Sequence, residues 1–157
     1  MTRVDPCSRH APIALPSRST CVALRAEPKS VPVARTVVKE LLGNYGAVLA
    51  EEAADTAFLV VTELFTNAVV HSNATTILLA LRITDGNLWV DVTDNGVLYH
   101  GIQERSASEL DENGRGLLLV RTLSRSWGKR TSCLGTKVWA VLPLMTRCSS
   151  DSFLIDR

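Results

Sequence analysis

The sequence lacks the features that mark several common classes of protein. Lysine and arginine number 17 against 16 acidic residues, so no global electric field favours nucleic acid or a membrane surface. The four cysteines are scattered without a Cys-x-x-Cys pair, and with three histidines they form no zinc-binding spacing. We therefore expect reduced thiols and no direct role on DNA.

The N-terminal stretch also lacks the apolar core of a signal peptide, because prolines interrupt it and arginines are spread through it. We identify no transmembrane span from the sequence and expect a cytoplasmic location. Residues 1–18 and 145–157 show little helical or strand pattern and are predicted to be tails. The 157 residues, with 46% hydrophobic content, can bury one core, so residues 19–144 are predicted to form a single domain.

What the sequence does contain is a polar pair inside an apolar helical run. Glu63 and Asn67 lie about one turn apart, so both project from the same side of a helix predicted over 52–71. A carboxylate there can accept a proton or polarise a hydroxyl, and a carboxamide oxygen suits a hard cation such as Mg²⁺ that already holds phosphates. The same pair is compatible with a solvated helix face, where polar side chains at this spacing are common.

A second polar group ends an apolar strand. Residues 76–84 and 88–94 are rich in β-forming residues and are joined through Asp85-Gly86, which predicts a hairpin. By the two-residue period of a strand, Asp94 falls at the end of the face that should be buried. A carboxylate there can accept a hydrogen bond from the exocyclic amino group of adenine, where guanine carries a carbonyl. Alternatively, Asp94-Asn95-Gly96 is only a turn.

A long polar stretch, Tyr99 to Asn113, follows that strand and is interpreted as a flexible lid. It leads through Gly114-Arg115-Gly116 into a helix predicted over 116–125. Glycines at such a point let the backbone approach an anion, and the free N–H groups of the first helical turn favour negative charge. A plain loop-to-helix junction has the same pattern. It matches neither the P-loop nor the longer dinucleotide fingerprint.

The remaining elements predict the fold class. Strands are expected near 20–26, 126–131 and 136–142, and a helix over 31–42. This order predicts an α+β two-layer sandwich, a mixed β-sheet covered on one face by helices. The helix at 31–42 carries an apolar stripe to pack on that sheet, made of Val33, Val37, Val38, Leu41 and Leu42. The three tryptophans, Trp89, Trp127 and Trp139, fall on predicted strands and are interpreted as packing residues.

The order and spacing of these motifs resemble the GHKL (Bergerat-fold) superfamily of ATP-binding domains. Within it, residues 19–144 are most similar to the stand-alone anti-sigma factor serine/threonine kinases of bacteria, especially those of actinobacterial type. The resemblance implies that Glu63 acts as the general base, that Asn67 binds Mg²⁺ and that Asp94 binds the adenine amino group. The further residues that it places at the nucleotide are Gly96, Gly114, Arg115, Gly116, Leu117 and Thr136.

Two departures from the family pattern bear on activity. The first glycine box commonly reads Asp-x-Gly-x-Gly, but Val97 and Leu98 follow Gly96 here. Adenine binding should survive, because the Asp and the first Gly remain. Ahead of the second glycine box, kinase members carry a basic residue that reaches the terminal phosphate, whereas this chain has Asp111-Glu112-Asn113. Phosphotransfer then needs another cation, which Arg115 or Arg105 could supply.

The resemblance implies an ATP–Mg²⁺-binding regulator that sequesters a sigma factor or a related regulator and phosphorylates a serine or threonine of an anti-anti-sigma (STAS-type) antagonist. Two alternatives stay open. An ATP-dependent scaffold would bind partners without phosphotransfer; Asp111-Glu112 favours it and Glu63 opposes it. A detached histidine kinase catalytic domain would need a phosphoacceptor hairpin in trans. The relatives also imply a homodimer, whose interface would cover the sheet edge or the strand near residues 20–26.

Overall fold

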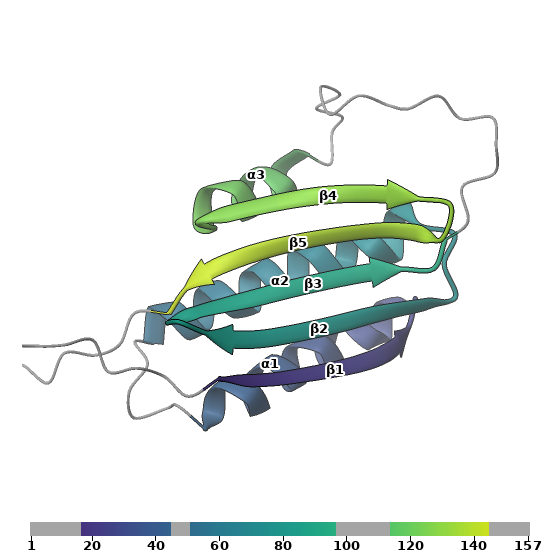
Figure 1. The fold of residues 1–157 in the computed structure, drawn as a ribbon. Coiled ribbons are helices and arrows are strands. Elements are labelled where there is room, and N and C mark those ends of the chain that lie inside the picture. The colour runs from purple at the N-terminus through teal and green to yellow at the C-terminus, as the bar shows by residue number, and fades with distance from the viewer. Residues whose placement is uncertain (1–16, 45–50, 97–113, 145–157) are drawn as a thin grey trace, which may run out of the picture.

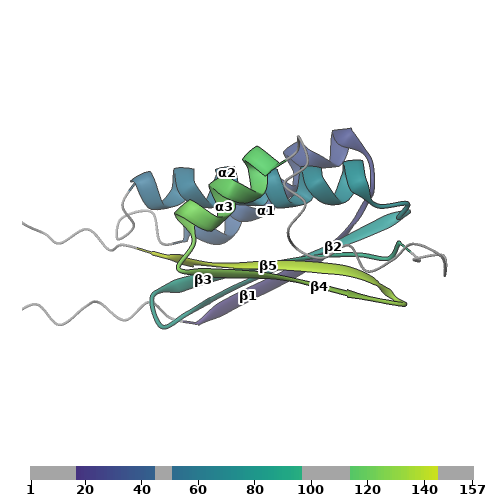
Figure 2. The same cartoon turned by 90° about the horizontal axis from the view of Figure 1, so that it is seen from above.

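The structure is a computed structural model that describes residues 17–44, 51–96 and 114–144. Within these ranges, five strands form one sheet in the order β1-β2-β3-β5-β4, and three α-helices cover one of its faces (Figure 1, Figure 2). The expected two-layer α+β sandwich is therefore confirmed. The expected lid, Tyr99 to Asn113, lies outside the described residues.

The elements lie close to the positions expected from the sequence. A short 3-10 helix, η2, which the sequence analysis did not predict, begins at a proline and leads from the first strand into the first helix. In chain order the elements are β1 (Arg18–Arg25), η2 (Pro28–Ser30), α1 (Val31–Gly43), α2 (Glu51–His71), β2 (Thr76–Thr84), β3 (Asn87–Asp94), α3 (Gly114–Leu123), β4 (Ser126–Ser132) and β5 (Gly135–Pro143).

The sheet is antiparallel at every described strand pair, where the sequence analysis expected a mixed sheet. Two helices connect β1 to β2, so the chain returns in the opposite direction. A single helix connects β3 to β4, and these two strands run the same way, but β5 lies between them (Figure 1). The strands that run in the same direction, such as β3 and β4, are thus never neighbours in the described sheet.

The hairpin between β2 and β3 has the geometry that its sequence predicts. Asp85 and Gly86 both have positive φ, 49° and 70°, as a two-residue turn between right-twisted strands requires. Beyond the turn the side chains alternate between the two faces of the sheet. The inward ones form the floor of the core: Ile77, Leu79, Leu81, Ile83, Leu88, Val90 and Val92.

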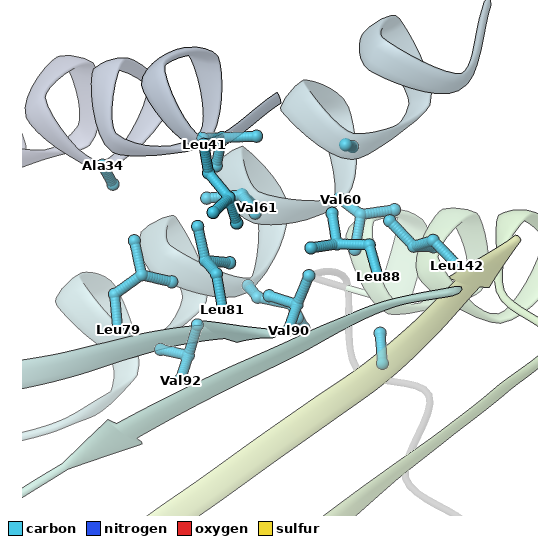
Figure 3. Close-up of a cluster of buried hydrophobic side chains, with 14 of the residues drawn as sticks. Ala34, Leu41, Val60, Val61, Leu79, Leu81, Leu88, Val90, Val92 and Leu142 are labelled. Atoms are coloured by element: carbon cyan, nitrogen blue, oxygen red, sulfur yellow. The ribbon is translucent and has the colours of Figure 1, made fainter. Parts of the chain in front are cut away.

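Helix α2 forms the roof of that core and lies across the sheet (Figure 2, Figure 3). Its buried side is made of Ala53, Ala57, Val60, Val61, Leu64 and Phe65. By length and composition this helix is apolar enough to cross a membrane, which the sequence analysis did not expect. Here its apolar side packs on the sheet, where each large side chain contributes about 1.5–3 kcal/mol on burial.

The apolar stripe of α1 is shifted from its expected position. Val38, Leu41 and Leu42 are buried, but Val33 is 47% exposed and the expectation for it was wrong. Ala34 is buried instead, because residues four apart share one face of a helix.

The tryptophans pack as interpreted, on both faces of the sheet. Trp127 packs against the core. Trp139 lies over Gly128, where a Cβ would stand 2.6 Å from its ring, so only glycine admits the indole on the neighbouring strand. On the face of the sheet without helices, the guanidinium carbon of Arg82 lies 5.2 Å from the centre of the Trp89 ring.

Candidate functional site

The carboxylate of Asp94 is buried at the end of β3, with only 7% of the residue exposed. Its Oδ1 accepts two backbone hydrogen bonds, from Gly96 N–H at 2.9 Å and from Thr136 N–H at 3.2 Å. These two bonds fix the plane of the carboxylate. Among the described residues no donor is bonded to the second oxygen, Oδ2, so it is available to a ligand that donates a hydrogen, such as an exocyclic amino group.

The approach of the β4–β5 turn to Asp94 depends on Gly135, at the start of β5. This residue has φ of +128°, and a Cβ on it would overlap the carbonyl oxygen of Asp94. Only glycine allows both the conformation and the contact. The sequence analysis assigned Gly135 no role; a glycine immediately before a β-rich run was the available signal.

Asn95 connects the end of β3 to the start of β2 through hydrogen bonds. Its Oδ1 accepts hydrogen bonds from the N–H groups of Thr75 and Thr76, at 3.1 and 3.0 Å. Its own N–H donates to the carbonyl of Thr76 at 3.3 Å. The expected alternative, a turn at Asp94-Asn95-Gly96, is thus present, because the Gly96 N–H bond to Asp94 closes an Asx turn. The same bonds hold the carboxylate in place.

A second polar group lies where α2 and α3 meet. A Cβ on Gly116 would overlap Oε2 of Glu63 and would stand 3.7 Å from Nδ2 of Asn67. The structure therefore brings Glu63, Asn67 and Gly116 together, as the sequence analysis expected of one site. Both side chains are half-buried and face α3, so the pair is not part of an open, solvated helix face.

The side-chain amide of Asn67 has a buried atom without a hydrogen-bond partner among the described residues, which suggests that it binds a ligand. Its Nδ2 is buried and has no hydrogen-bond partner among the described residues. Leaving such a group unpaired costs about 1–3 kcal/mol. The oxygen and nitrogen of an amide exchange places by a half rotation, so the group can meet a phosphate with N–H or a cation with oxygen. This fits Mg²⁺, which takes one or two protein oxygens and completes its shell with water and phosphate.

The other expected site residues that the structure describes lie on α3 and β5. Gly114 begins α3, and the side chain of Arg115 lies outside the described part of the chain. Leu117 packs, partly buried, against the core. The hydroxyl of Thr136 lies 3.5 Å from that of Thr131, beside the backbone N–H that Thr136 gives to Asp94. Arg105 and residues 111–113 also lie outside the described ranges.

Comparison with solved structures gives the same fold. The RsbU and RsbW domains of Rv1364c from Mycobacterium tuberculosis match with a TM-score of 0.64 and 20% identity, over 83% of this chain and 33% of that chain. The histidine kinase domain of the blue-light activated kinase EL346 from Erythrobacter litoralis matches with a TM-score of 0.50 and 24% identity, over 74% of this chain and 60% of that one. The chain thus spans less than two thirds of either.

No curated protein matches the chain significantly. A family model described as the histidine kinase-like ATPase domain matches residues 24–142, which include all five strands in part or whole and every site residue named above. The order of the motifs and the antiparallel sheet under three helices agree with that match. The chain therefore belongs to the histidine kinase-like ATPase domain family, the ATP-binding GHKL class that its motifs resemble.

Proposed function

We propose that this protein is an ATP–Mg²⁺-dependent regulator that sequesters a sigma factor or a related regulator and phosphorylates a serine or threonine on an anti-anti-sigma antagonist of STAS type. Family membership supports ATP binding. The likeness to a structure that contains an RsbW domain supports the regulatory role, at the level of fold. We also place it in the cytoplasm, where sigma factors act.

The observation that carries the proposal is the pairing of two polar groups at one layer interface. Helix α2, which bears Glu63 and Asn67, packs against both β3 and β5, the strands that hold Asp94 and Thr136. One group has a carboxylate oxygen fixed by backbone N–H groups, as recognition of a base edge requires. The other has a carboxylate beside an unpaired amide, as phosphate chemistry requires.

Each residue has a distinct role in the proposed reaction. Asp94 accepts the adenine amino hydrogen, and Thr136 supports the base beside it. Asn67 would hold Mg²⁺, which when bound neutralises phosphate charge. Glu63 orients the attacking hydroxyl of the partner and takes its proton. Gly116 gives the phosphates access to the backbone at the first turn of α3, where N–H groups are unpaired within the helix.

One sequence feature favours a second function, an ATP-dependent scaffold without phosphotransfer. Asp111-Glu112-Asn113 stands where kinases of this type carry a basic residue. Repulsion between these carboxylates and the terminal phosphate would slow phosphotransfer while leaving nucleotide binding intact. The scaffold would use ATP to order its partner surface. Fold likeness to a histidine kinase domain keeps a third candidate, a detached histidine kinase catalytic domain acting in trans.

One experiment separates the three. The purified protein is mixed with γ-labelled ATP, Mg²⁺ and STAS-type proteins encoded near its gene, and label transfer is followed by gel and by the acid stability of the product. Acid-stable label on an antagonist supports the kinase, because phosphoserine and phosphothreonine resist acid. Acid-labile label would indicate a histidine kinase domain. Capture of the antagonist without any transfer would leave the scaffold as the function.

A further inference from the structure

The edge strand β4 carries a concentration of positive charge that the nucleotide site does not use. Lys129 and Arg130 lie side by side on it, Arg125 immediately precedes it and Arg121 lies in the last turn of α3 beside it. All four side chains are exposed. The sequence of residues 114–144 contains no aspartate or glutamate, so this edge is cationic although the whole chain carries a net charge of only +1.

These cations are unpaired within the described residues. None of the four forms an ion pair there, whereas Lys137, one strand inward, bonds Asp91 at 3.0 Å. The contrast matters because Arg130 stands directly opposite Lys137 in the strand register. Asp91, the acid on this face in the described part of the sheet, is already bonded to Lys137, and like charges across a strand pair are destabilising. An external anion would relieve that repulsion.

The backbone of the same strand is also open. In the described part of the sheet β4 pairs only with β5, so its other edge presents free N–H and C=O groups (Figure 1). Charged side chains on an edge strand commonly serve only to prevent aggregation. That explanation accounts for Lys129 and Arg130 but not for Arg121, which lies on a helix, or for Arg125, which precedes the strand.

We infer that β4 is a docking edge for an extended, acidic segment of a protein partner, which adds to the sheet as a further strand. Lys129 and Arg130 are consecutive and point to opposite faces of the sheet. The fitting segment therefore has acidic side chains on both of its faces, with more acid near Arg125. Backbone pairing supplies affinity and the charges supply register and specificity, as in other cases of strand addition.

A nucleic acid fits this edge less well. Single strands bind protein grooves through aromatic rings on which bases stack. The tryptophans nearest to β4 are occupied, since Trp127 packs on the core and Trp139 on Gly128. The inference goes beyond the proposed function, because Lys129 and Arg130 have no role in the proposed nucleotide site and docking on this edge needs no nucleotide.

The test uses the full chain and a fluorescently labelled synthetic peptide as long as β4, built of threonine and glutamate with acids at consecutive positions. Fluorescence anisotropy measures binding to the parent protein and to the double variant Lys129→Glu/Arg130→Glu. The matched control is Arg35→Glu/Lys39→Glu, an equal charge change on the exposed side of α1. We expect roughly tenfold or greater loss of affinity for the first variant and about twofold or less for the control, since close charge pairs dominate over distant ones.

Two further probes decide the mode of binding. The same peptide with N-methylated backbone amides keeps its charge but cannot pair as a strand, and it should bind much more weakly. Equal binding of the methylated peptide, no binding of the plain peptide, or equal loss in both variants would overturn the inference. The inference would also be overturned if oligothymidylate bound the parent protein more tightly than the peptide does and lost that binding in the Lys129→Glu/Arg130→Glu variant. An ATP-induced rise in melting temperature, recorded on each variant, reports separately on the nucleotide site.

Discussion

Gly116 on α3 lies against the carboxylate of Glu63 on α2, so closely that a methyl group on Gly116 would overlap Oε2. Two helices far apart in sequence thus come into contact at a position of α3 that has no side chain. Glycine boxes of this type are usually explained by their approach to phosphate. Here the glycine also determines where the proposed base can stand, because Glu63 occupies the volume that any other residue would fill.

The first prediction concerns this contact. Gly116→Ala should push the carboxylate of Glu63 aside at little cost in the free energy of unfolding, because the end of a glutamate side chain can rotate away and alanine favours the helix. Phosphotransfer should fall further than stability alone explains. Gly43→Ala is the control, because nothing lies within 4 Å of a Cβ there. Urea unfolding and a transfer assay on both variants measure the effects; equal behaviour of the two would show that the contact is unimportant.

The second prediction concerns recognition of the adenine ring by Asp94. Asp94→Asn keeps an oxygen for the N–H groups of Gly96 and Thr136 but turns an amide N–H₂ toward the ligand, where it meets the adenine amino group donor to donor. ATP affinity should fall by roughly 1–3 kcal/mol, the usual cost of a mispaired buried group. GTP should bind the parent protein poorly. Calorimetry with both nucleotides measures this, and equal affinity of the parent for ATP and GTP would exclude adenine recognition by Asp94.

Much of the site follows from local pattern, but its assembly does not. The two-residue period places Asp94 on the buried face of β3, and the helical turn places Glu63 beside Asn67; both positions are correct. The bond from Thr136 to Asp94 spans 42 residues and exists because β5 inserts between β3 and β4. Local propensity carries no information on that insertion. The antiparallel sheet was missed for the same reason.

Packing between layers accounts for the other differences. Val33 is as apolar as its neighbours, but it lies off the helical face that Ala34 shares with Val38. The side of α1 that meets the core, rather than apolar character alone, decides which residue is buried. Gly135 was likewise assigned no role, because its contact with the Asp94 carbonyl arises only once the β4–β5 turn folds over the end of β3.

The third prediction tests Gly135. Gly135→Ala places a Cβ in a conformation with φ of +128° and against the Asp94 carbonyl, so both strain and overlap oppose it. The free energy of unfolding should fall by about 1–3 kcal/mol from the backbone strain alone. ATP affinity should fall too, because the turn carries Thr136. Denaturant unfolding and calorimetry measure the two effects, with Gly43→Ala again as control. Unchanged nucleotide affinity would show that the β4–β5 turn does not contribute to the nucleotide site.

The last prediction separates Glu63 from Asn67. Glu63→Gln keeps shape and nucleotide affinity but removes the group that takes the proton, so transfer should fall by about 10²–10⁴, the usual contribution of a general base. Asn67→Ala removes the amide whose buried nitrogen has no partner among the described residues, so Mg²⁺-dependent nucleotide affinity and partner capture should fall together. Nucleotide affinity, partner capture and transfer are measured on both variants. The parent protein could capture an antagonist without labelling it, and Glu63→Gln could leave that capture intact. In that case the carboxylate of Glu63 takes no proton, and the protein is an ATP-dependent scaffold rather than a kinase.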